Sequence, residues 1–563
     1  MNISLFFSIF TWILGIAILL YSYFFLKGRK RYLEFFLYGL LTLIIATKAF
    51  KTDDFLIFLI FWGVLLILLY AMLSIGSFKT ASRALAILGI ADFCLIIGII
   101  FLISITKTTS MNISPVSTDN LFSIVTFMLI AIGAIAKAGV FGFHNWIIES
   151  AETNPSVTMA FFPACLDKFI GIYLFLRVFK DFFIVSDLLK IIFMGIGALT
   201  ILFAVLLALI QHDMKKLLAY HAVSQVGYMV LGIASGTLLG MVGGLFHMLN
   251  NTIYKSSLFL NSGNIEYTIG KTDLNEIGGL AKYMPVTFLA TVIASFSISG
   301  IPPFNGFFSK WIIYQSLITN GSVSFLAICK MVFLVIALFG SALTLASFLK
   351  IIYSAFLNTP PKENIKKIKE VPFIMQLPIL FMSILCIGFG IFANNLVIKP
   401  FLAPLFDETL VPSGFWASTV ATVLMVLGIA LGFGFYFLSR LPVRKNNIFI
   451  GGEELADSRV SGTDFYLTLK ETQPLRLFYN SSDKGVFDFY TGITTFLKVI
   501  SYIFYYSIDR IINFTTNAVG KSVFGASILL KKLHNGLLDR YVTWLILGLV
   551  LVIGVLYRCL SCI

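Results

Sequence analysis

Charged residues are scarce in this chain. They make up 12% of its 563 residues, about half of the ~25% that is typical of a soluble domain. Hydrophobic residues make up 58%. This composition excludes a soluble enzyme, a disordered protein and a nucleic-acid-binding protein, and no nucleic acid is expected among the partners.

Cysteine is also sparse and follows no pattern. The six cysteines, at positions 94, 165, 329, 386, 559 and 562, are scattered through apolar segments, without the spacing of metal ligands. They are expected to be reduced, small hydrophobic side chains. No cysteine set could hold an iron–sulfur cluster and no glycine-rich nucleotide fold is found. The chain is therefore expected to carry no cofactor and no metal of its own.

Long apolar runs are abundant instead. About fourteen approach the ~20 residues that a transmembrane helix needs. They are 3–26, 33–48, 55–76, 84–105, 121–146, 157–178, 188–211, 217–235, 239–263, 286–320, 326–356, 372–395, 412–438 and 541–558. The first run is followed by Lys27 and Arg29–Arg31 and lacks a small-residue cleavage site, so a retained anchor is expected, with numbering from Met1. The sequence predicts an all-α polytopic membrane protein.

The net charge of +14 is interpreted as a topology signal. Loops after odd-numbered runs hold most of the Lys and Arg residues, among them Lys215, Lys216 and Arg440, and the alternate loops hold far fewer. Basic loops tend to face the cytoplasm. The N-terminus is therefore predicted outside and region 440–540 inside.

The C-terminal region differs from the rest of the chain. Residues 446–485 are polar and predict a cytoplasmic loop. Residues 486–535 mix apolar residues with charges too closely spaced for a span, and a helix of ~48 residues would be roughly 70 Å long, too long for an upright crossing. A lateral interfacial helix is predicted, with two short helices broken near Gly520 or Gly525 as the alternative. Residues 536–563 predict a transmembrane anchor.

Ionisable side chains at membrane depth need a reason, because each costs about 2.5–3.5 kcal/mol at mid-bilayer on insertion scales. The predicted spans contain Asp92, Lys137, Asp167, Lys168, His247, Lys255, Lys310, Lys330 and Lys350. Lys330 and Lys350 lie within reach of an interface and can snorkel. Lys137, Lys255 and Lys310 are flanked by apolar sequence on both sides, and buried lysine suits proton transfer.

Two of these lysines lie beside helix breakers. Ser299–Pro303 interrupts a run shortly before Lys310, and glycines at 133, 139 and 142 surround Lys137. Unwound backbone at membrane depth is tolerated only where protein or water satisfies it, so a broken helix with a lysine beside it points to an ion path. The two broken spans lie five spans apart, which predicts inverted five-helix repeats.

The predicted segments are an N-terminal helix at 1–32, repeats at 33–178 and 188–356, and additional spans at 372–445. Within the second repeat, His247, Asn251 and Lys255 are spaced i, i+4 and i+8 and share one helix face. Histidine can relay protons near neutral pH. The sequence therefore predicts a polar stripe inside the membrane.

Several stretches resemble the antiporter-like subunits of respiratory complex I, the Mrp cation/proton antiporters and the energy-converting membrane-bound hydrogenases. The matching stretches are Ala136–Gly139 with Phe143–Trp146, Gln211–Tyr220 with Ser224–Met229, Phe246–Met248 with Lys255–Leu260, and Pro302–Lys310. Residues 486–558 resemble the lateral helix and final anchor of the largest such subunit.

The resemblance implies a proton path along the membrane plane, entered near Lys137 and left near Lys310. Its members would be Lys137, Lys168, His247, Lys255 and Lys310, with His144, Asn251 and Lys330 as accessory candidates. Two departures stand out. The family's usual glutamate is absent from Phe61-Trp62-Gly63, which leaves Asp92 or Asp167 as the candidate carboxylate that modulates Lys137. Asn251 occupies the place of a second histidine, where hydration would bridge the gap.

The function implied is a proton-translocating, or sodium-translocating, subunit of a redox-driven complex in the prokaryotic cytoplasmic membrane. The pattern looks closest to the energy-converting hydrogenases, followed by complex I. Iron–sulfur clusters, nickel–iron or flavin would then belong to partner subunits, both membrane and peripheral. The alternatives are an Mrp-type antiporter subunit, the membrane subunit of an inorganic-carbon uptake complex, and a structural anchor with a dead channel.

Overall fold

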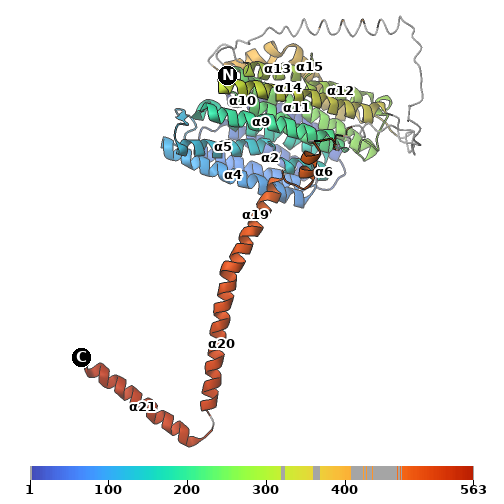
Figure 1. The fold of residues 1–563 in the computed structure, drawn as a ribbon. Coiled ribbons are helices and arrows are strands. Elements are labelled where there is room, and N and C mark those ends of the chain that lie inside the picture. The colour runs from blue at the N-terminus through green and yellow to red at the C-terminus, as the bar shows by residue number, and fades with distance from the viewer. Residues whose placement is uncertain are drawn as a thin grey trace. The chain divides into compact units, whose positions relative to one another are not determined.

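The computed structural model describes residues 3–318, 324–358, 368–406 and 475–561 except 535, together with isolated positions between 423 and 473. The chain divides into two units, Met1–Tyr490 and Thr491–Ile563 (Figure 1). Most of the predicted run at 412–438 and most of the predicted loop at 446–485 lie outside the described residues.

Unit 1 is a helical bundle. Its main helices are α1 (Ile3–Leu26), α2 (Tyr32–Lys51), α3 (Phe55–Leu73), α4 (Phe78–Thr106), α5 (Leu121–Ala138), α6 (Asn145–Thr153), α7 (Ser156–Phe161), α8 (Asp167–Arg177), α9 (Asp187–Leu209), α10 (Met214–Ala234), α11 (Leu238–Ile269), α12 (Pro285–Ser299), α13 (Asn305–Leu317), α14 (Phe325–Ile351), α15 (Phe373–Ile391) and α18 (Leu475–Asp483). In the described part of the chain, β1 (Val116–Ser117) and β2 (Phe183–Ile184) form a single short parallel pairing.

The protein is an all-α polytopic membrane protein, as the sequence predicts. Among the described residues, eleven helices are long and apolar enough to cross a membrane. The remaining predicted runs are the long polar helix α11, the broken pair α12 and α13, and the run at 412–438, most of which lies outside the described part. Many outward leucines and isoleucines of α2, α3 and α4 are exposed, as suits a surface that faces lipid.

The helices begin and end at residues suited to those positions. The Asp54 carboxylate accepts the N–H groups of Leu56 and Ile57 at the start of α3, which satisfies donors that a helix N-terminus leaves free. A hydrogen bond from Thr109, followed by those from the backbone, lowers the pKa of Asp54. Ser77, Asn120 and Asp213 cap α4, α5 and α10 in the same way.

Two spans are broken in the middle. α5 ends at Gly139 and resumes as α6, and α12 ends at Gly300 and resumes as α13. We call the end of the bundle at residues 210–216, between α9 and α10, the basic end, and the end where α4 passes to α5 the distal end. Because α5 enters its break from the distal end and α12 from the basic end, the two repeats have inverted topology.

Helices α7 to α11 form the interior of unit 1. Every residue of Ser156–Phe182, a segment that includes α7 and α8, is buried except Lys180 and Asp181, and so is nearly every residue of α10. Helix α11 is 32 residues long and carries His247, Asn251 and Lys255, all fully buried. Charges and amides thus lie where lipid does not reach them.

Part of the predicted loop is helical. Leu475–Asp483 form α18, whose Phe478 and Tyr479 pack against the end of α9 around Leu206 and Leu207. The packing of its apolar face against the bundle stabilises this short helix. The polar composition of the segment does not predict it.

Unit 2 consists of long helices and begins within the first turn of α19. α19 (Phe489–Phe504), a π-helical turn (Tyr505–Asp509) and α20 (Arg510–Leu533) follow one another, and α20 passes Gly520 and Gly525 without a break. The alternative of two short helices broken at these glycines is therefore wrong. α21 (Leu538–Ser561) is apolar enough to span a membrane.

Candidate functional site

The first broken span places Lys137 in the last turn of α5. Gly139 ends the helix with a φ of 85°, a backbone conformation that favours glycine. Lys137 is 1% exposed, and its Nζ has no hydrogen-bond partner among the described residues. An unpaired ammonium is costly in a low-dielectric interior, so the surrounding charges decide what this lysine can do.

Trp62 and two carboxylates surround Lys137. The Nζ atom lies 5.6 Å from the centroid of the Trp62 ring, within cation–π range. Trp62 Nε1 donates a hydrogen bond to Asp92 Oδ1 at 2.7 Å. Asp92 and Asp167 both lie within Coulombic range of Lys137, and each has one buried oxygen without a hydrogen-bond partner in the described structure. The tryptophan thus holds one carboxylate near the lysine.

Lys168, on α8, closes the same break. Its Nζ donates to the carbonyl of Ala138, directly before Gly139. The end of α5 leaves this carbonyl without an intrahelical donor. Lys168 is fully buried and follows Asp167 directly in the chain. The first repeat therefore contains two buried aspartates, Asp92 and Asp167, and two buried lysines, Lys137 and Lys168.

Lys310 lies at the second break. Its Nζ donates to the carbonyl of Ile298, in the last turn of α12, and to Ser341 Oγ on α14, both at 2.9 Å. It lies 4.6 Å from the centroid of the Tyr228 ring, whose hydroxyl is held by the carbonyl of Ala337 at 2.8 Å. This lysine bridges both sides of the broken helix.

The two breaks have the same hydrogen-bonding arrangement, but they differ in the charged side chains around the lysines. In each, a side chain from the following long span bonds the carbonyl before the left-handed glycine: Lys168 on Ala138, and Ser341 on Ser299 at 3.0 Å. Among the described residues, the buried carboxylates are Asp92, Asp167 and Asp488. None lies in the second repeat, where carbonyls, hydroxyls and ring faces hold the lysines.

His247 and Lys255 of α11 lie between the breaks. His247 Nδ1 is 2.9 Å from Ser309 Oγ, one residue before Lys310, and its Nε2 is 3.1 Å from Gln225 Oε1. Lys255 Nζ donates to the carbonyl of Leu218 at 3.1 Å. The histidine is thus linked directly to the second break, while Lys255 faces α10.

The accessory candidates have different surroundings. His144 begins α6, is 2% exposed and stacks on Phe141 at 4.6 Å. The amide of Asn251 is buried, and neither of its polar atoms has a partner among the described residues. Lys330 lies within Coulombic range of Asp187 and Lys190 at the start of α9, and therefore near a membrane end.

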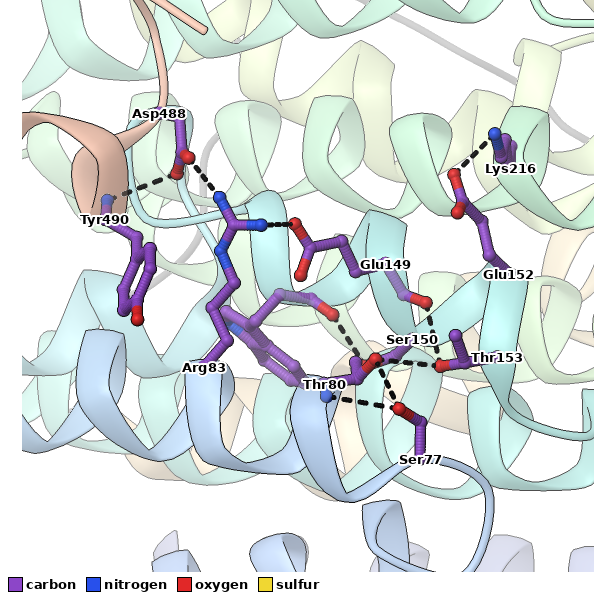
Figure 2. Close-up of polar contacts among 11 residues, drawn as sticks. Ser77, Thr80, Arg83, Glu149, Ser150, Glu152, Thr153, Lys216, Asp488 and Tyr490 are labelled. Atoms are coloured by element: carbon purple, nitrogen blue, oxygen red, sulfur yellow. Dashed lines mark hydrogen bonds and ion pairs between the residues drawn. The ribbon is translucent and has the colours of Figure 1, made fainter.

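An ion cluster fixes the basic end of the first broken span (Figure 2). Arg83 of α4 forms ion pairs with Glu149 of α6 and with Asp488, and its guanidinium lies 4.7 Å from the centroid of the Tyr490 ring. Lys216 pairs with Glu152 close by. The second half of the broken span is therefore tied to α4, to α10 and to the segment before α19.

The first residue of α19 and a residue just before this helix also touch the break itself. Phe487 lies 5.5 Å from Phe141, and Phe489 lies 4.6 Å from Phe143, between ring centroids. In α18, Tyr479 donates to the carbonyl of Leu206 at 3.0 Å. Burial raises the pKa of Tyr479 to about 12, so the phenol keeps its proton at neutral pH. This segment covers the break from the basic end.

Sequence reasoning missed several contributors. The sequence gives Trp62 only as part of the place where a glutamate is missing, and it does not predict a role for Ser309, Ser341 or His221, although His221 directly follows the matched stretch Gln211–Tyr220. Serine has no distinctive pattern in an apolar run. Within the described residues, no group of three or more His, Cys, Asp or Glu side chains could hold a metal ion.

The protein has two inverted repeats, each with a broken helix, and a polar central helix lies between their buried lysines. These features define a multi-pass membrane protein of the antiporter-like class. The chain belongs to the family described as "NADH:quinone oxidoreductase/Mrp antiporter, TM", whose model matches residues 52–337.

Named relatives come from more than one kind of complex. The chain is 31% identical to hydrogenase-4 component B of Escherichia coli K12, over 61% of this chain and 56% of the relative. It is 27% identical to a Na(+)/H(+) antiporter subunit of Alkalihalophilus pseudofirmus, over 86% of this chain and 62% of the relative. The first curated relatives are matched over 51–65% of their own length.

The fold is also that of a solved structure. A chain of the membrane-bound sulfane sulfur reductase, described as an archaeal respiratory membrane complex, superposes with a TM-score of 0.75 at 22% identity. The match covers 98% of this chain and 88% of that chain. At this identity the likeness concerns the fold.

Proposed function

We propose that the chain is a proton-translocating subunit of a redox-driven multisubunit complex in the prokaryotic cytoplasmic membrane. The observation that carries this proposal is the placement of Lys137 and Lys310 at two inverted broken spans, with the buried polar helix α11 between them. A charge at such depth is costly, and a structural anchor has no need of it.

The proton enters the path in the first repeat. A proton that arrives from the basic end reaches Lys137, whose ammonium is stabilised by Asp92 and Asp167. When either carboxylate is neutralised or drawn away, the ammonium loses that stabilisation and the proton moves on towards Lys168. The Trp62 N–H fixes one oxygen of Asp92 and leaves the other free to face the lysine.

The second repeat releases the proton. His247 bonds Ser309 and Gln225 through its two ring nitrogens, so a proton taken at one nitrogen can leave from the other. Lys310 then holds it between Ile298 and Ser341. The unpaired amide of Asn251 marks where ordered water would bridge His247 and Lys255, since a buried polar group needs a partner.

The complex would supply the energy. The hydrogenase-type relative and the respiratory fold likeness support a redox-driven machine, in which iron–sulfur clusters, nickel–iron or flavin belong to partner subunits. The second candidate is a subunit of an Mrp-type antiporter that exchanges sodium for protons. It is favoured by the similarity that extends over 86% of this chain.

The test replaces Lys310 in the assembled complex. In sodium-free proteoliposomes, a potassium diffusion potential drives protons and an enclosed pH dye reports them. Lys310→Ala is expected to abolish the flux, whereas Lys30→Ala, at an exposed lysine near the basic end, leaves it unchanged. Undiminished flux in Lys310→Ala would refute the proposed function, and flux that appears only with sodium would favour the antiporter.

A further inference from the structure

Tyr314 carries a buried polar group that the path proposed above does not use. It lies on α13, four residues and about one turn after Lys310. Its hydroxyl is buried and has no well-formed hydrogen bond among the described residues. A buried hydroxyl without a good partner costs free energy, so its position beside the second break needs a reason.

The Tyr314 hydroxyl is one of three that lie beside Lys310. It is near enough to the hydroxyls of Tyr228 and Ser341 to interact with both, and the rings of Tyr228 and Tyr314 are 6.5 Å apart between centroids. Lys310 Nζ donates to Ser341 Oγ at 2.9 Å and lies 4.6 Å from the centroid of the Tyr228 ring. Helices α10, α13 and α14 therefore each contribute one hydroxyl to this group.

The two tyrosines lie on the distal side of the lysine. α13 runs from the break towards the distal end, so Tyr314 follows Lys310 in that direction. α10 runs the same way and carries Tyr228 in its distal half. The Tyr228 hydroxyl donates to the carbonyl of Ala337 at 2.8 Å, which lies about one turn nearer the distal end of α14 than Ser341. The group therefore extends from Lys310 towards the distal end.

α14 continues to that end of the bundle. Beyond Ala337, the buried residues of this helix in the distal direction are Leu334 and Lys330. Lys330 lies within Coulombic range of Asp187 and Lys190 at the start of α9, and the side chain of Asp187 is 65% exposed. A proton that leaves the hydroxyl group in this direction thus meets ionisable side chains that are open to solvent.

We propose that Tyr314 and Tyr228 relay protons from Lys310 towards the distal end of the second repeat. The relay rests on the proposed function, since it needs a proton that reaches Lys310. A hydroxyl both donates and accepts. The Tyr314 oxygen accepts the proton of the ammonium while its own proton passes to the Tyr228 oxygen, and Tyr228 releases its proton on the distal side. Rotation of the two hydroxyls restores the starting state.

A purely structural role of Tyr314 predicts something else. Removal of a buried hydroxyl without a good partner keeps the ring packing and is neutral or stabilising. Tyr314→Phe is therefore expected to assemble with an unchanged or higher melting temperature in either case, and the relay alone predicts a loss of flux. Tyr228→Phe also removes the bond to Ala337, so it needs a control that loses a comparable bond.

The experiment measures the proton flux of Tyr314→Phe and Tyr228→Phe in proteoliposomes, in H₂O and in D₂O, with Tyr173→Phe as the control. Tyr173 is a fully buried tyrosine of the first repeat that donates to the carbonyl of Phe50 at 3.4 Å, away from the path. Both relay variants are expected to lower the flux per assembled complex by about tenfold or more, since a positioned proton-transfer group contributes on the order of 10²–10⁴. D₂O is expected to slow them more than the wild type, because proton release then limits the rate. The control is expected to keep the wild-type flux and isotope effect.

Wild-type flux in Tyr314→Phe, with flux lost in Lys310→Ala, would overturn the relay and leave the axis standing. Undiminished flux in Lys310→Ala would instead refute the proposed function. Reduced flux in Tyr314→Phe with a wild-type isotope effect would show a structural defect and would also overturn the relay. Should Tyr228→Phe fail to assemble, Tyr314→Phe decides alone, because it gives up no well-formed hydrogen bond.

Discussion

Lys137 and Lys310 are held by different kinds of neighbours. Lys137 has no hydrogen bond within the described structure and depends on Trp62, Asp92 and Asp167, whereas Lys310 is bonded by Ile298 and Ser341. A carboxylate can change its charge or position and a backbone carbonyl cannot. Modulation of the proposed path is therefore expected in the first repeat.

This difference predicts the effect of removing the carboxylates. Asp92→Asn and Asp167→Asn are each expected to reduce proton flux, and the double variant to abolish it, because Lys137 then has no buried counter-charge. Trp62→Phe keeps the ring face and removes the N–H donor to Asp92. It is expected to give a smaller loss.

The measurement is the proteoliposome flux at several pH values, with Asp119→Asn, in the exposed loop at the distal end, as the control. Flux equal to the wild type in the double variant would exclude both aspartates as substitutes for the missing glutamate.

At the scale of elements, the second break depends on close backbone contact. A Cβ on Gly306 would lie 1.8 Å from the carbonyl oxygen of Ser297, and a Cβ on Gly390 would lie 1.9 Å from the carbonyl oxygen of Pro303. Backbone cannot yield as a flexible side chain can. These glycines allow α13 and α15 to lie directly against the break that positions Lys310.

We therefore expect Gly306→Ala and Gly390→Ala each to lower the free energy of unfolding by about 1–3 kcal/mol, the usual cost of overpacking. Gly89→Ala in α4 is the matched control, because its Cβ would meet nothing within 4 Å. Thermal unfolding of the purified protein in detergent measures the difference. A melting temperature as high in Gly306→Ala as in Gly89→Ala would contradict the packing that the structure shows.

Much of this fold follows from local sequence signals. Apolar runs mark the spans, and the glycines at 139 and 300 mark the breaks beside both lysines. Those signals are local in the chain. The Trp62–Asp92 bond, the His221–Ser347 bond and the Arg83–Asp488 ion pair join residues 30, 126 and 405 positions apart. Such pairings are set by how whole helices pack, which one sequence does not reveal.

The carbonyls that hold the lysines are harder still to predict. The lysines donate to the backbone oxygens of Ala138, Leu218 and Ile298. Every residue has such an oxygen, so the side chains at these positions do not indicate the role. Phe478 and Tyr479 of α18 stand in a segment of polar composition, and their packing on α9 arises only when the bundle is assembled.

In the proposed function, a proton passes between the two repeats through α11. The first repeat contributes lysines with counter-charges, the second contributes lysines without them, and Lys255 lies between the two. If the repeats worked separately, removal of Lys255 would leave each half intact.

The most direct measurement is therefore the proton flux of Lys255→Met in the assembled complex, driven by a potassium diffusion potential in proteoliposomes. Methionine fills a similar volume without a charge, so assembly and melting temperature are expected to be preserved. We predict loss of proton flux, as in Lys310→Ala. A fully assembled Lys255→Met complex with wild-type flux would contradict passage through α11.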